Sequence, residues 1–540
     1  MATFQNRSIM NYRLALKSFL ENQAIQKIFR LAFILGLSFF AIWLINYAIT
    51  IITTPVPVEF REGAILLSTN YLLHGINPYS LVNQPLGMNV YGLGYNFVVL
   101  PFAALLGNTL AVHRAISIIC LLLVGIIIGK WLILRGSSLL FAVSGGLIIL
   151  AGLLFYTTPV TRPDALGVLL FVSAIYLPMR YQYRYKSLIA SSLLSVFAFD
   201  TKPYFILALG IVLTYLFLFV SKRKGYIYLL GSLAVLLITI LLVNHFFECY
   251  FLDTVLNNIS IAGRNTRFML MQLQFFMVLY LPIWIIILVV ALSPTYSRHP
   301  NNSFQPMKNF FQNQGVAPDI LHGDKPFFQF HIDLAWYSFL ISTLAIILIL
   351  GKHQNTYIAY LLQIMSPFLI VGALSHFNFK RAFSILAVPL ILVNLYIICI
   401  WILYPNNPQS YQKGWNQLEQ VISGTNKILN SPAIAPLLIQ MNKPIVDSGQ
   451  SDFYYQTLPY PKTILAPAYN TVKQRGIDYQ NQIISEINAK GFEKIIVTID
   501  NSHLVPWAAI QQKYQYQETI SLGMPQTGQV WNVEVWIPKN

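Results

Sequence analysis

Charged side chains are scarce in this sequence. Only 10% of its 540 residues are Asp, Glu, Lys or Arg, whereas 56% are hydrophobic, and the mean hydropathy is +0.58. A soluble multidomain protein carries nearer ~25% charged residues, so a soluble enzyme is excluded and we expect most of the chain to lie in lipid. Cysteine is also rare. The three cysteines, Cys120, Cys249 and Cys399, lie in or beside apolar runs, which excludes a disulfide-stapled scaffold and leaves no metal-ligand spacing.

The formal net charge of +16 raises the question of a nucleic-acid partner. Residues 1–404 hold 25 of the 35 basic residues and 10 of the 19 acidic ones, and residues 405–540 hold the other 10 and 9. The basic excess therefore belongs to the apolar part of the chain. The preference of Lys and Arg for the cytoplasmic side of a membrane accounts for it, and we expect no nucleic acid.

The sequence contains eleven apolar runs. Runs of this kind cross a hydrocarbon core of ~30 Å as helices. They lie at about 30–52, 110–129, 138–156, 165–179, 187–199, 203–220, 226–246, 271–293, 334–350, 357–374 and 382–404. Basic residues precede the first run, which places the N-terminal segment, residues 1–28, in the cytoplasm. A cleavable signal peptide is the alternative, but no small-x-small cleavage site follows the run.

Alternate threading of these runs places every dense basic cluster on the cytoplasmic side. The clusters are Lys130 and Arg135; Arg180, Arg184 and Lys186; Lys222, Arg223 and Lys224; Arg298, Lys308 and Lys325; and Lys380 and Arg381. The scheme requires residues 91–107 to form a short re-entrant or interfacial helix. The runs at 165–179 and 187–199 fall short of the ~20 residues of a perpendicular span, which predicts recessed outer ends or a hydrated cavity there.

The composition changes after Tyr404, and no later window could span a membrane. We predict a helix near 415–429, a second helix at 479–489, a buried strand ending at Asp500, and an alternating strand in QVWNVEVWIP. The predicted fold class is an α-helical polytopic membrane protein of about eleven transmembrane helices, residues 29–404, with a first outer loop at 53–109. Residues 405–540 form a small extracytoplasmic α/β domain.

Thirteen charged residues of the membrane part remain on the outer side. They are Arg61, Arg114, Arg162, Lys202, Arg264, Arg267 and Lys352, with Glu59, Glu62, Asp164, Asp200, Glu248 and Asp253. Charges at membrane depth are costly and are usually paired or functional. Glu59 and Glu62, with Arg61 between them, suit acid/base chemistry, because the like charge raises one pKa while the arginine holds the other carboxyl ionised. A helix start, whose acidic side chains offset free N–H groups, is the alternative.

Two further groups meet the same outer face. Arg162 and Asp164 flank a proline at the start of a predicted helix, and Asp200 and Lys202 lie between two helices. Each has a structural alternative: an ordinary helix start for the first and a snorkelling lysine for the second. Their convergence with the first outer loop makes them candidates for one site.

Several short motifs in these regions are similar to one family of membrane enzymes. They are EFREG followed by NPY, YGLGYNFVVLPFAALLG, TRPDALGVLLFVSAIYL, DTKPYF and GKHQNTY. Together they resemble the GT-C superfamily of membrane glycosyltransferases, in the bacterial branch related to protein O-mannosyltransferases and aminoarabinose transferases. Two departures stand out: the first catalytic carboxylate of the family is most often Asp, and its Tyr-Pro-Pro is replaced here by the residues 91–95, YGLGY.

The resemblance implies transfer of a sugar from a polyprenyl-phosphate donor to a glycan, lipid or protein acceptor on the outer face of a bacterial inner or plasma membrane, usually with inversion. Glu59 is then the expected general base, with Glu62 supporting or replacing it. The other expected roles are donor phosphate binding by Arg61, Arg162 and Lys202, and substrate positioning by Asp164, Asp200, Tyr91 and Tyr95. A divalent metal, Mg or Mn, is compatible with the carboxylates, although no ligand spacing requires one.

Two other functions remain open at this point. A lipid-linked glycan ligase or polymerase is expected to carry its key loop outside in the second half of the chain, whereas the loop 294–333 threads to the inside. A flippase-type transporter is expected to show charges in mid-helix or paired half-helices in an internal repeat, and neither pattern is visible.

Overall fold

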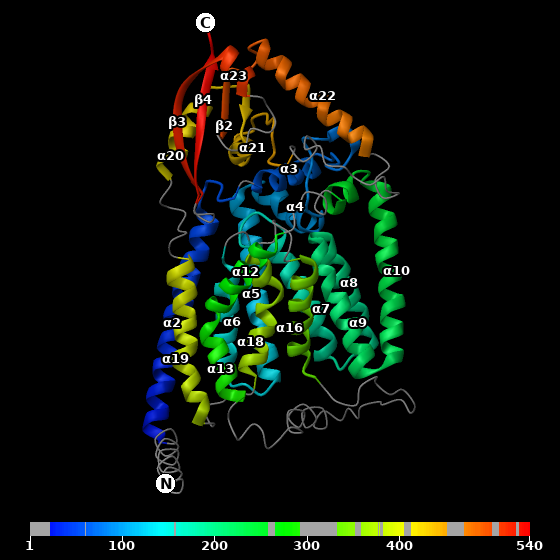
Figure 1. Ribbon diagram of the computed structural model, residues 1–540, viewed down its shortest axis with the longest axis vertical. Coiled ribbons are helices and arrows are strands. Elements are labelled where there is room, and N and C mark those ends of the chain that lie inside the picture. Colours follow the sequence, from blue (N-terminus) through cyan, green and yellow to red (C-terminus); the bar gives the residue numbers. More distant parts are fainter. Residues whose placement is uncertain are drawn as a thin grey trace.

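The protein, described here as a computed structural model, has two parts stacked along its longest axis, with the first described helix starting at one end of that axis and the C-terminus at the other (Figure 1). A helical bundle forms the larger part, and a small sheet with helices lies above it. The structure describes residues 22–59, 61–155, 158–256, 265–291, 332–350, 358–375, 377, 382–403, 412–450, 469–498, 507–524 and 529–540. Several predicted features lie outside these residues. They are the boundary at 405, most of the loop 294–333, the motif GKHQNTY, and the residues Asp500, Arg264 and Lys352.

Each predicted apolar run coincides with a helix or with consecutive helices of the bundle. These are α2 (Gln23–Thr53), α5 (Leu110–Leu134), α6 (Leu139–Leu153), α7 (Asp164–Arg180), α8 (Tyr185–Thr201), η2 (Pro203–Ile206), α9 (Leu207–Tyr215), η3 (Leu216–Val220), α10 (Lys222–Phe246), α12 (Thr266–Leu279), α13 (Leu281–Ala291), α16 (Leu334–Ala345), η5 (Ile346–Leu350), α17 (Ile358–Ile364), α18 (Ser366–Leu374), α19 (Ala382–Tyr396) and η6 (Ile397–Leu403). A short π-helical segment, η4 (Leu252–Leu256), follows α10. Polar caps mark several starts: the Asn22 and Thr109 side chains accept hydrogen bonds from N–H groups in the first turns of α2 and α5, which would otherwise lack partners.

Only some of these helices are long enough to cross a membrane on their own. In the described part of the chain, four helices are long and apolar enough to cross a membrane: α2, α5, the helix over Pro203–Val220, and α10. The pair α12 and α13, bent by 69°, is a fifth candidate. Helices α7 and α8 have 17 residues each, a rise of about 26 Å, which is less than a ~30 Å core. The chain is an integral membrane protein with several apolar helices, and the number eleven stays a prediction.

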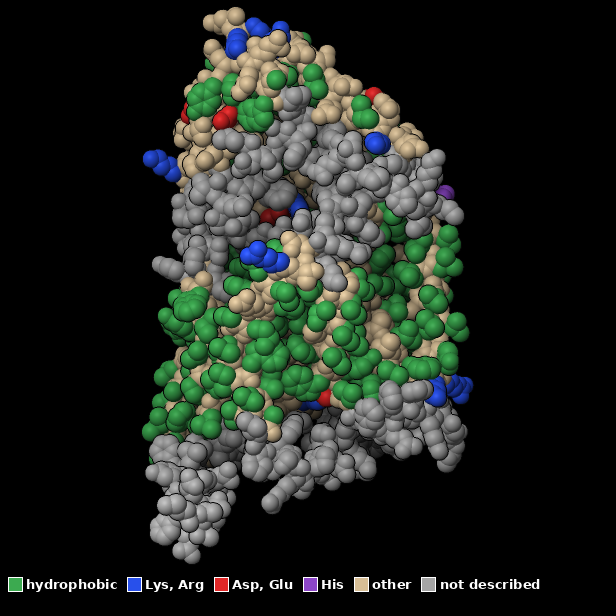
Figure 2. Space-filling model, viewed as in Figure 1, with side chains coloured by type: hydrophobic (Ala, Val, Ile, Leu, Met, Phe, Trp, Pro, Cys, Tyr) green, Lys and Arg blue, Asp and Glu red, His purple; other side chains and the backbone are tan. Residues whose placement is uncertain are grey.

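The outermost helices carry their apolar side chains outward. Figure 1 shows α2 and α10 on opposite flanks of the bundle, and only 22% and 11% of their most apolar windows are buried. Figure 2 shows the result as a broad apolar belt around the bundle. Exposed apolar surface on this scale marks contact with a membrane or a partner, and lipid is the cover that the helix lengths indicate.

The first outer loop contains α3 (Glu62–Leu73), η1 (Leu81–Asn83) and α4 (Gly94–Leu106). The 13 residues of α4 rise about 20 Å, too little for a crossing, which agrees with the short helix predicted at 91–107. Every residue of α3 from Glu62 to Thr69 is buried. Helix α3 is covered on both sides: α4 packs below it and the C-terminal domain lies above it.

The C-terminal domain is built on a four-stranded mixed sheet. Its elements are α20 (Gln412–Ser423), β1 (Ile428–Asn430), η9 (Pro432–Ile434), α21 (Ala435–Gln440), α22 (Tyr469–Asn488), β2 (Lys494–Thr498), α23 (Trp507–Lys513), β3 (Tyr514–Met524) and β4 (Gln529–Pro538). The strand order is β1-β2-β4-β3, with β1 parallel to β2 and the other two pairs antiparallel. The sequence predicted β2, β4 and α22 and the start of α20.

The predicted helix at 415–429 was too long. Helix α20 ends at Ser423, and Ile428, Leu429 and Asn430 form strand β1 with all three side chains buried. The apolar pair in this strand packs on both faces of the sheet: Ile428 joins the cluster around Trp415, and Leu429 joins the cluster around Ile495. A strand covered on two faces lacks the alternation that identifies exposed strands, so the sequence pattern concealed it.

The C-terminal domain is held on the first outer loop by polar and apolar contacts. The Val90 N–H donates to Gln450 Oε1 at 2.5 Å, and the Arg475 guanidinium of α22 donates to the Val82 carbonyl at 2.8 Å. Beside these bonds, Ile439 of α21 packs with an apolar cluster on α3 and α5. The segments around α3 and Val90 are therefore enclosed between bundle and domain.

The close approach of α3 to the domain depends on Gly63. A Cβ at this position would lie 2.9 Å from Ala435 Cβ and 2.9 Å from the Ser448 carbonyl oxygen. We predict that Gly63→Ala destabilises the protein by about 1–3 kcal/mol, the usual cost of overpacking, measured as a lower midpoint of thermal unfolding in detergent. The matched control is Gly231→Ala, where a Cβ meets nothing within 4 Å, and an equal loss there would contradict the prediction.

Candidate active site

Four charged residues predicted from the sequence meet in one row beneath the C-terminal domain. Glu59 lies in the loop between α2 and α3, Arg162 and Asp164 stand at the start of α7, and Lys202 follows the last residue of α8. Arg162 Nη1 lies 3.5 Å from Glu59 Oε1, and Arg162 Nε lies 3.2 Å from Asp164 Oδ2. Lys202 Nζ lies 2.7 Å from Asp164 Oδ1. Anions and cations therefore alternate along the row.

The row is almost completely removed from solvent. The relative exposure of these four residues is 0–3%. Isolated charges at such depth are strongly disfavoured, and ion pairs with further hydrogen bonds offset much of that cost. The short helices explain how charges reach this position, because the start of α7 and the end of α8 place them directly at the upper ends of the helices.

Tyr91 lies against the two cations of the row. The Arg162 guanidinium carbon lies 5.0 Å from the centroid of its ring, and Lys202 Nζ lies 4.8 Å from the same centroid. The hydroxyl of Tyr91 accepts a hydrogen bond of 3.4 Å from Arg61 Nη1. The electron-rich face of the ring attracts cations, so Tyr91 holds three of the predicted basic residues around one side chain.

A layer of uncharged polar residues behind Asp164 was missed by the sequence analysis. Gln363 Nε2, on α17, donates to Asp164 Oδ1 at 2.8 Å and to Thr158 Oγ1 at 3.1 Å, and the Tyr204 hydroxyl donates to Gln363 Oε1. The ring of Tyr360 lies 5.0 Å from Lys202 Nζ. Gln363 is fully buried, but an uncharged residue inside the apolar run of α17 gives no sign of this layer in the sequence.

Glu62 occupies a different environment from Glu59. Arg114 of α5 donates from Nε to Glu62 Oε1 at 3.0 Å and from Nη2 to Oε2 at 2.9 Å. The remaining positions of the carboxylate accept from the backbone N–H groups of Val58 and Thr161, both at 2.9 Å. Glu62 and Arg114 are both 0% exposed. This bidentate pair joins the loop after α2, the start of α3, α5 and the segment before α7.

The two glutamates also differ in acidity. Burial raises the pKa of the Glu59 carboxyl above its ordinary value, and the positive charges of Arg162 and Arg61 offset only part of that effect. Burial acts in the same direction on Glu62, but the charge and hydrogen bonds of Arg114 and the two backbone donors bring its pKa below the ordinary value. Glu62 is held as a carboxylate, whereas Glu59 is the group with affinity for a proton.

Two predicted positioning residues lie apart from the row. The Tyr95 hydroxyl donates to the His113 carbonyl at 2.9 Å and lies 3.2 Å from Ser117 Oγ, both on α5. The Asp200 carboxylate accepts from the Tyr250 hydroxyl. The structure therefore does not bring Tyr95 and Asp200 to Glu59 and Arg162, although the sequence analysis grouped them.

The glycines of the YGLGY stretch are explained by the end of α8. A Cβ on Gly92 would lie 1.4 Å from the Asp200 carbonyl oxygen, and one on Gly94 would lie 2.8 Å from Asp200 Oδ2. The Gly92 N–H donates to the Thr201 carbonyl at 3.3 Å. The chain that carries Tyr91 can approach the turn carrying Lys202 only because these two side chains are absent.

Acidic and basic side chains are visible above the apolar belt in Figure 2. In the described part of the chain, no group of three or more His, Cys, Asp or Glu side chains could hold a metal ion. The cationic partners of Glu59 and Asp164 in this region are arginine and lysine.

Solved structures provide the comparison that decides the fold. The chain superposes on ArnT from Cupriavidus metallidurans bound to undecaprenyl phosphate with a TM-score of 0.53 and 11% identity, over 92% of this chain and 97% of ArnT. The apo state of the same protein gives a TM-score of 0.50 and 10% identity over the same shares. The chain has the GT-C fold. No family model and no curated protein matches the sequence, so the likeness lies in the architecture, where it confirms the resemblance drawn from the motifs.

The Arg114–Glu62 pair generates a prediction about stability within this GT-C fold. We expect Arg114→Met to destabilise the protein by about 3–5 kcal/mol, because it leaves a buried carboxylate without its counter-charge. Unfolding in detergent, followed by intrinsic fluorescence, measures the loss. The double variant Arg114→Met/Glu62→Gln removes the unpaired charge and should recover part of the stability; a double variant less stable than Arg114→Met would contradict this account.

Proposed function

We propose that this protein is a glycosyltransferase that moves a sugar from a polyprenyl-phosphate donor to a hydroxyl of an acceptor. The GT-C fold and the lipid carrier bound to its structural neighbour support a lipid-linked donor at the coarse level. The observation that carries the proposal is the buried row itself, in which a carboxyl group with a raised pKa stands beside cations fixed at the upper end of the bundle.

Glu59 is the proposed general base. The acceptor hydroxyl oxygen attacks the anomeric carbon of the sugar while its proton passes to the Glu59 carboxylate, and the bond from the anomeric carbon to the phosphate oxygen breaks. Attack on the face opposite the departing phosphate inverts the configuration. A positioned base of this kind contributes about 10²–10⁴-fold to the rate, and a raised pKa increases its affinity for the proton.

The departing polyprenyl phosphate carries negative charge that the site must stabilise. Arg61, Arg162 and Lys202 surround the ring of Tyr91 and supply fixed positive charge at one place. Such preorganised charge stabilises a developing anion without reorganisation of solvent. Asp164 holds Arg162 and Lys202 in position, and Glu62 serves as the structural partner of Arg114 rather than as a second base.

The proposed orientation places the site and the C-terminal domain on the extracytoplasmic side. Lys130, Arg180, Lys186 and Lys222 lie near the ends of α5, α7, α8 and α10 that point away from the site. Because Lys and Arg favour the cytoplasmic side, the opposite end of the bundle faces outward. The N-terminus then lies in the cytoplasm, and the acceptor is a glycan, lipid or protein of the cell envelope.

The role of Glu59 is tested by Glu59→Gln. We expect the rate of sugar transfer to fall by about 10²–10⁴-fold, since the amide cannot take the proton, while binding of the polyprenyl-phosphate donor is kept. The assay follows transfer of a radiolabelled sugar from extracted lipid-linked donors by the purified protein. Glu248→Gln is the matched control, because Glu248 accepts from the Leu81 N–H on the surface of the same end of the bundle. Transfer by Glu59→Gln at the wild-type rate would refute the assignment.

The raised pKa of Glu59 predicts the shape of the pH profile. The base acts as a carboxylate, so activity should be complete above its pKa and fall as the pH drops through it. Because that pKa lies above the ordinary glutamate value, we expect the acidic limb of the transfer rate at a pH higher than a solvent-exposed glutamate would give. Glu59→Asp should move this limb, and a limb that stays in place would assign it to another group.

A further inference from the structure

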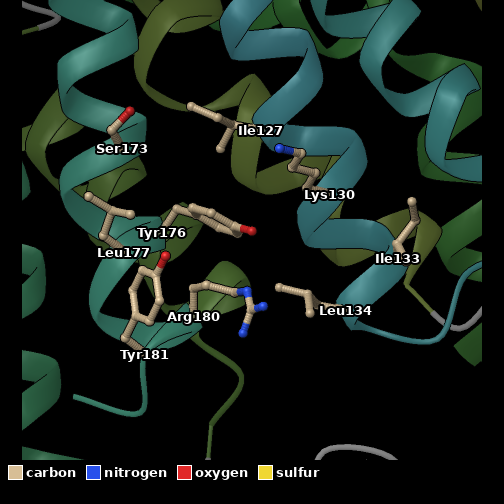
Figure 3. Close-up of a pocket in the computed structure, with 9 residues that line it drawn as sticks. All are labelled: Ile127, Lys130, Ile133, Leu134, Ser173, Tyr176, Leu177, Arg180 and Tyr181. Atoms are coloured by element: carbon tan, nitrogen blue, oxygen red, sulfur yellow. The ribbon is translucent and has the colours of Figure 1, made fainter. Parts of the chain in front are cut away.

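A second cavity lies at the end of the bundle opposite the row of Glu59 and Lys202. It has a volume of about 500 Å³ and lies between the last turns of α5 and α7. Figure 3 shows the side chains that line it, among them Ile127, Lys130 and Leu134 from α5 and Tyr176, Leu177 and Arg180 from α7. A volume of this size is in the range of small-molecule binding sites, and neither the transfer reaction nor its donor uses it.

The cavity lies at the level of the membrane surface opposite the active site. Helix α5 starts at Leu110 beside the first outer loop, and Lys130 follows 20 residues later, about 30 Å further along the helix axis. This rise equals the thickness of a hydrocarbon core. The apolar residue Ile127 therefore lies toward the lipid tails, and Lys130 and Arg180 lie near the headgroups of the leaflet opposite the active site.

The polar groups of the cavity converge on one space. In Figure 3 the Lys130 ammonium, the Tyr176 hydroxyl and the Arg180 guanidinium point into the gap between the two helices. The Tyr176 ring packs on Trp131, with centroids 5.7 Å apart, and Trp131 is 0% exposed; the Arg180 guanidinium carbon lies 5.6 Å from the Tyr181 ring centroid. Among the described residues that line the cavity there is no carboxylate, so an anion with several acceptor oxygens would meet two cations and a hydroxyl donor there.

The same cavity has an apolar wall that continues onto the lipid-facing surface. Ile127, Ile133 and Leu177 line it. Ile133 exposes 48% of its surface, and Ile126, next to Ile127 on α5, exposes 52%. An anionic head with an apolar tail fits this arrangement, whereas a soluble phosphate would use only its polar end. Basic pockets between helices at the membrane surface are known to accept lipid headgroups.

We propose that this cavity binds the phosphate headgroup of one anionic phospholipid from the leaflet opposite the active site. Lys130, Arg180 and Tyr176 hold the phosphate, and an acyl chain lies along Ile127, Ile126 and the outer face of α5. The site is independent of sugar transfer, because none of its residues touches the row at the other end of the bundle. It places a lipid between α5, which carries Arg114, and α7, which begins at Asp164.

The test is lipid binding by the purified full-length protein, followed by native mass spectrometry with phosphatidylglycerol and phosphatidylcholine as probes. We expect one phosphatidylglycerol to be retained at least about 10-fold more tightly than phosphatidylcholine. Lys130→Gln/Arg180→Gln should lose this preference, because two charge-assisted contacts disappear. Lys222→Gln/Arg223→Gln removes two charges at the start of α10, at the same end of the bundle, and should keep it.

Several outcomes would overturn the proposal. Equal loss in both double variants would show that general surface charge attracts the lipid. Equal affinity for both lipids would show that the phosphate is not recognised by charge, and glycerol 3-phosphate binding as tightly as the phospholipid would show a soluble ligand. If Lys130→Gln/Arg180→Gln does not fold, Tyr176→Phe preserves the packing on Trp131 and should weaken phosphatidylglycerol about 3–10-fold through the lost hydrogen bond; an unchanged affinity would count against the site.

Discussion

The structure depends on the pairing of charges that water does not reach. Glu59, Arg162, Asp164 and Lys202 tolerate burial because each lies beside an opposite charge, and Glu62 tolerates it because Arg114 and backbone donors surround its carboxylate. The two glutamates differ in how firmly their carboxylates are held. The acceptor positions of Glu62 are filled from three segments of the chain, α5, the loop after α2 and the segment before α7, so its carboxylate is held in place. Glu59 has a longer and weaker contact with Arg162, which leaves it able to exchange that partner for a substrate.

The arrangement of helices around these pairs has a clear order. Long apolar helices at the flanks, α2 and α10, meet the lipid, while the shorter α7 and α8 end below the level that the flanking helices reach and carry charges at those ends. Helix α3 lies across the top and is buried between α4 and the C-terminal domain. The domain thus closes the bundle above the row.

Much of this could be predicted from the sequence because charge is so rare in it. A carboxylate or guanidinium in an apolar chain needs a partner. The sequence alone therefore groups Glu59, Arg162, Asp164 and Lys202 as candidates for one site. The sequence does not group three other residues with them: Gln363, Thr158 and Tyr204. Uncharged polar residues occur widely in apolar helices, and their spacing does not indicate a distant partner. The resemblance gave Tyr91 and Tyr95 one role, but Tyr91 lies beside Arg162 and Lys202, whereas the Tyr95 hydroxyl lies against α5.

The residues around Glu59 and Glu62 in the sequence do not show which of the two is the proposed base. Three residues separate Glu59 from Glu62, and the motif alone left either as the base. The distinction comes from Arg114, which lies 52 positions later in the chain and which the sequence analysis had counted among the outer charges without assigning it a role. Likewise, β1 was hidden because a strand buried on two faces has no alternating pattern.

The attachment of the C-terminal domain to the loop before Tyr91 has an evolutionary consequence. Arg475 of α22 binds the carbonyl oxygens of Val82 and Gln84, and Gln450 binds the Val90 N–H. Every residue type presents the same carbonyl group, so mutations at positions such as 82 leave the Arg475 contact chemically intact. Residues 82 and 84 can therefore change in sequence while the C-terminal domain stays attached to the first outer loop.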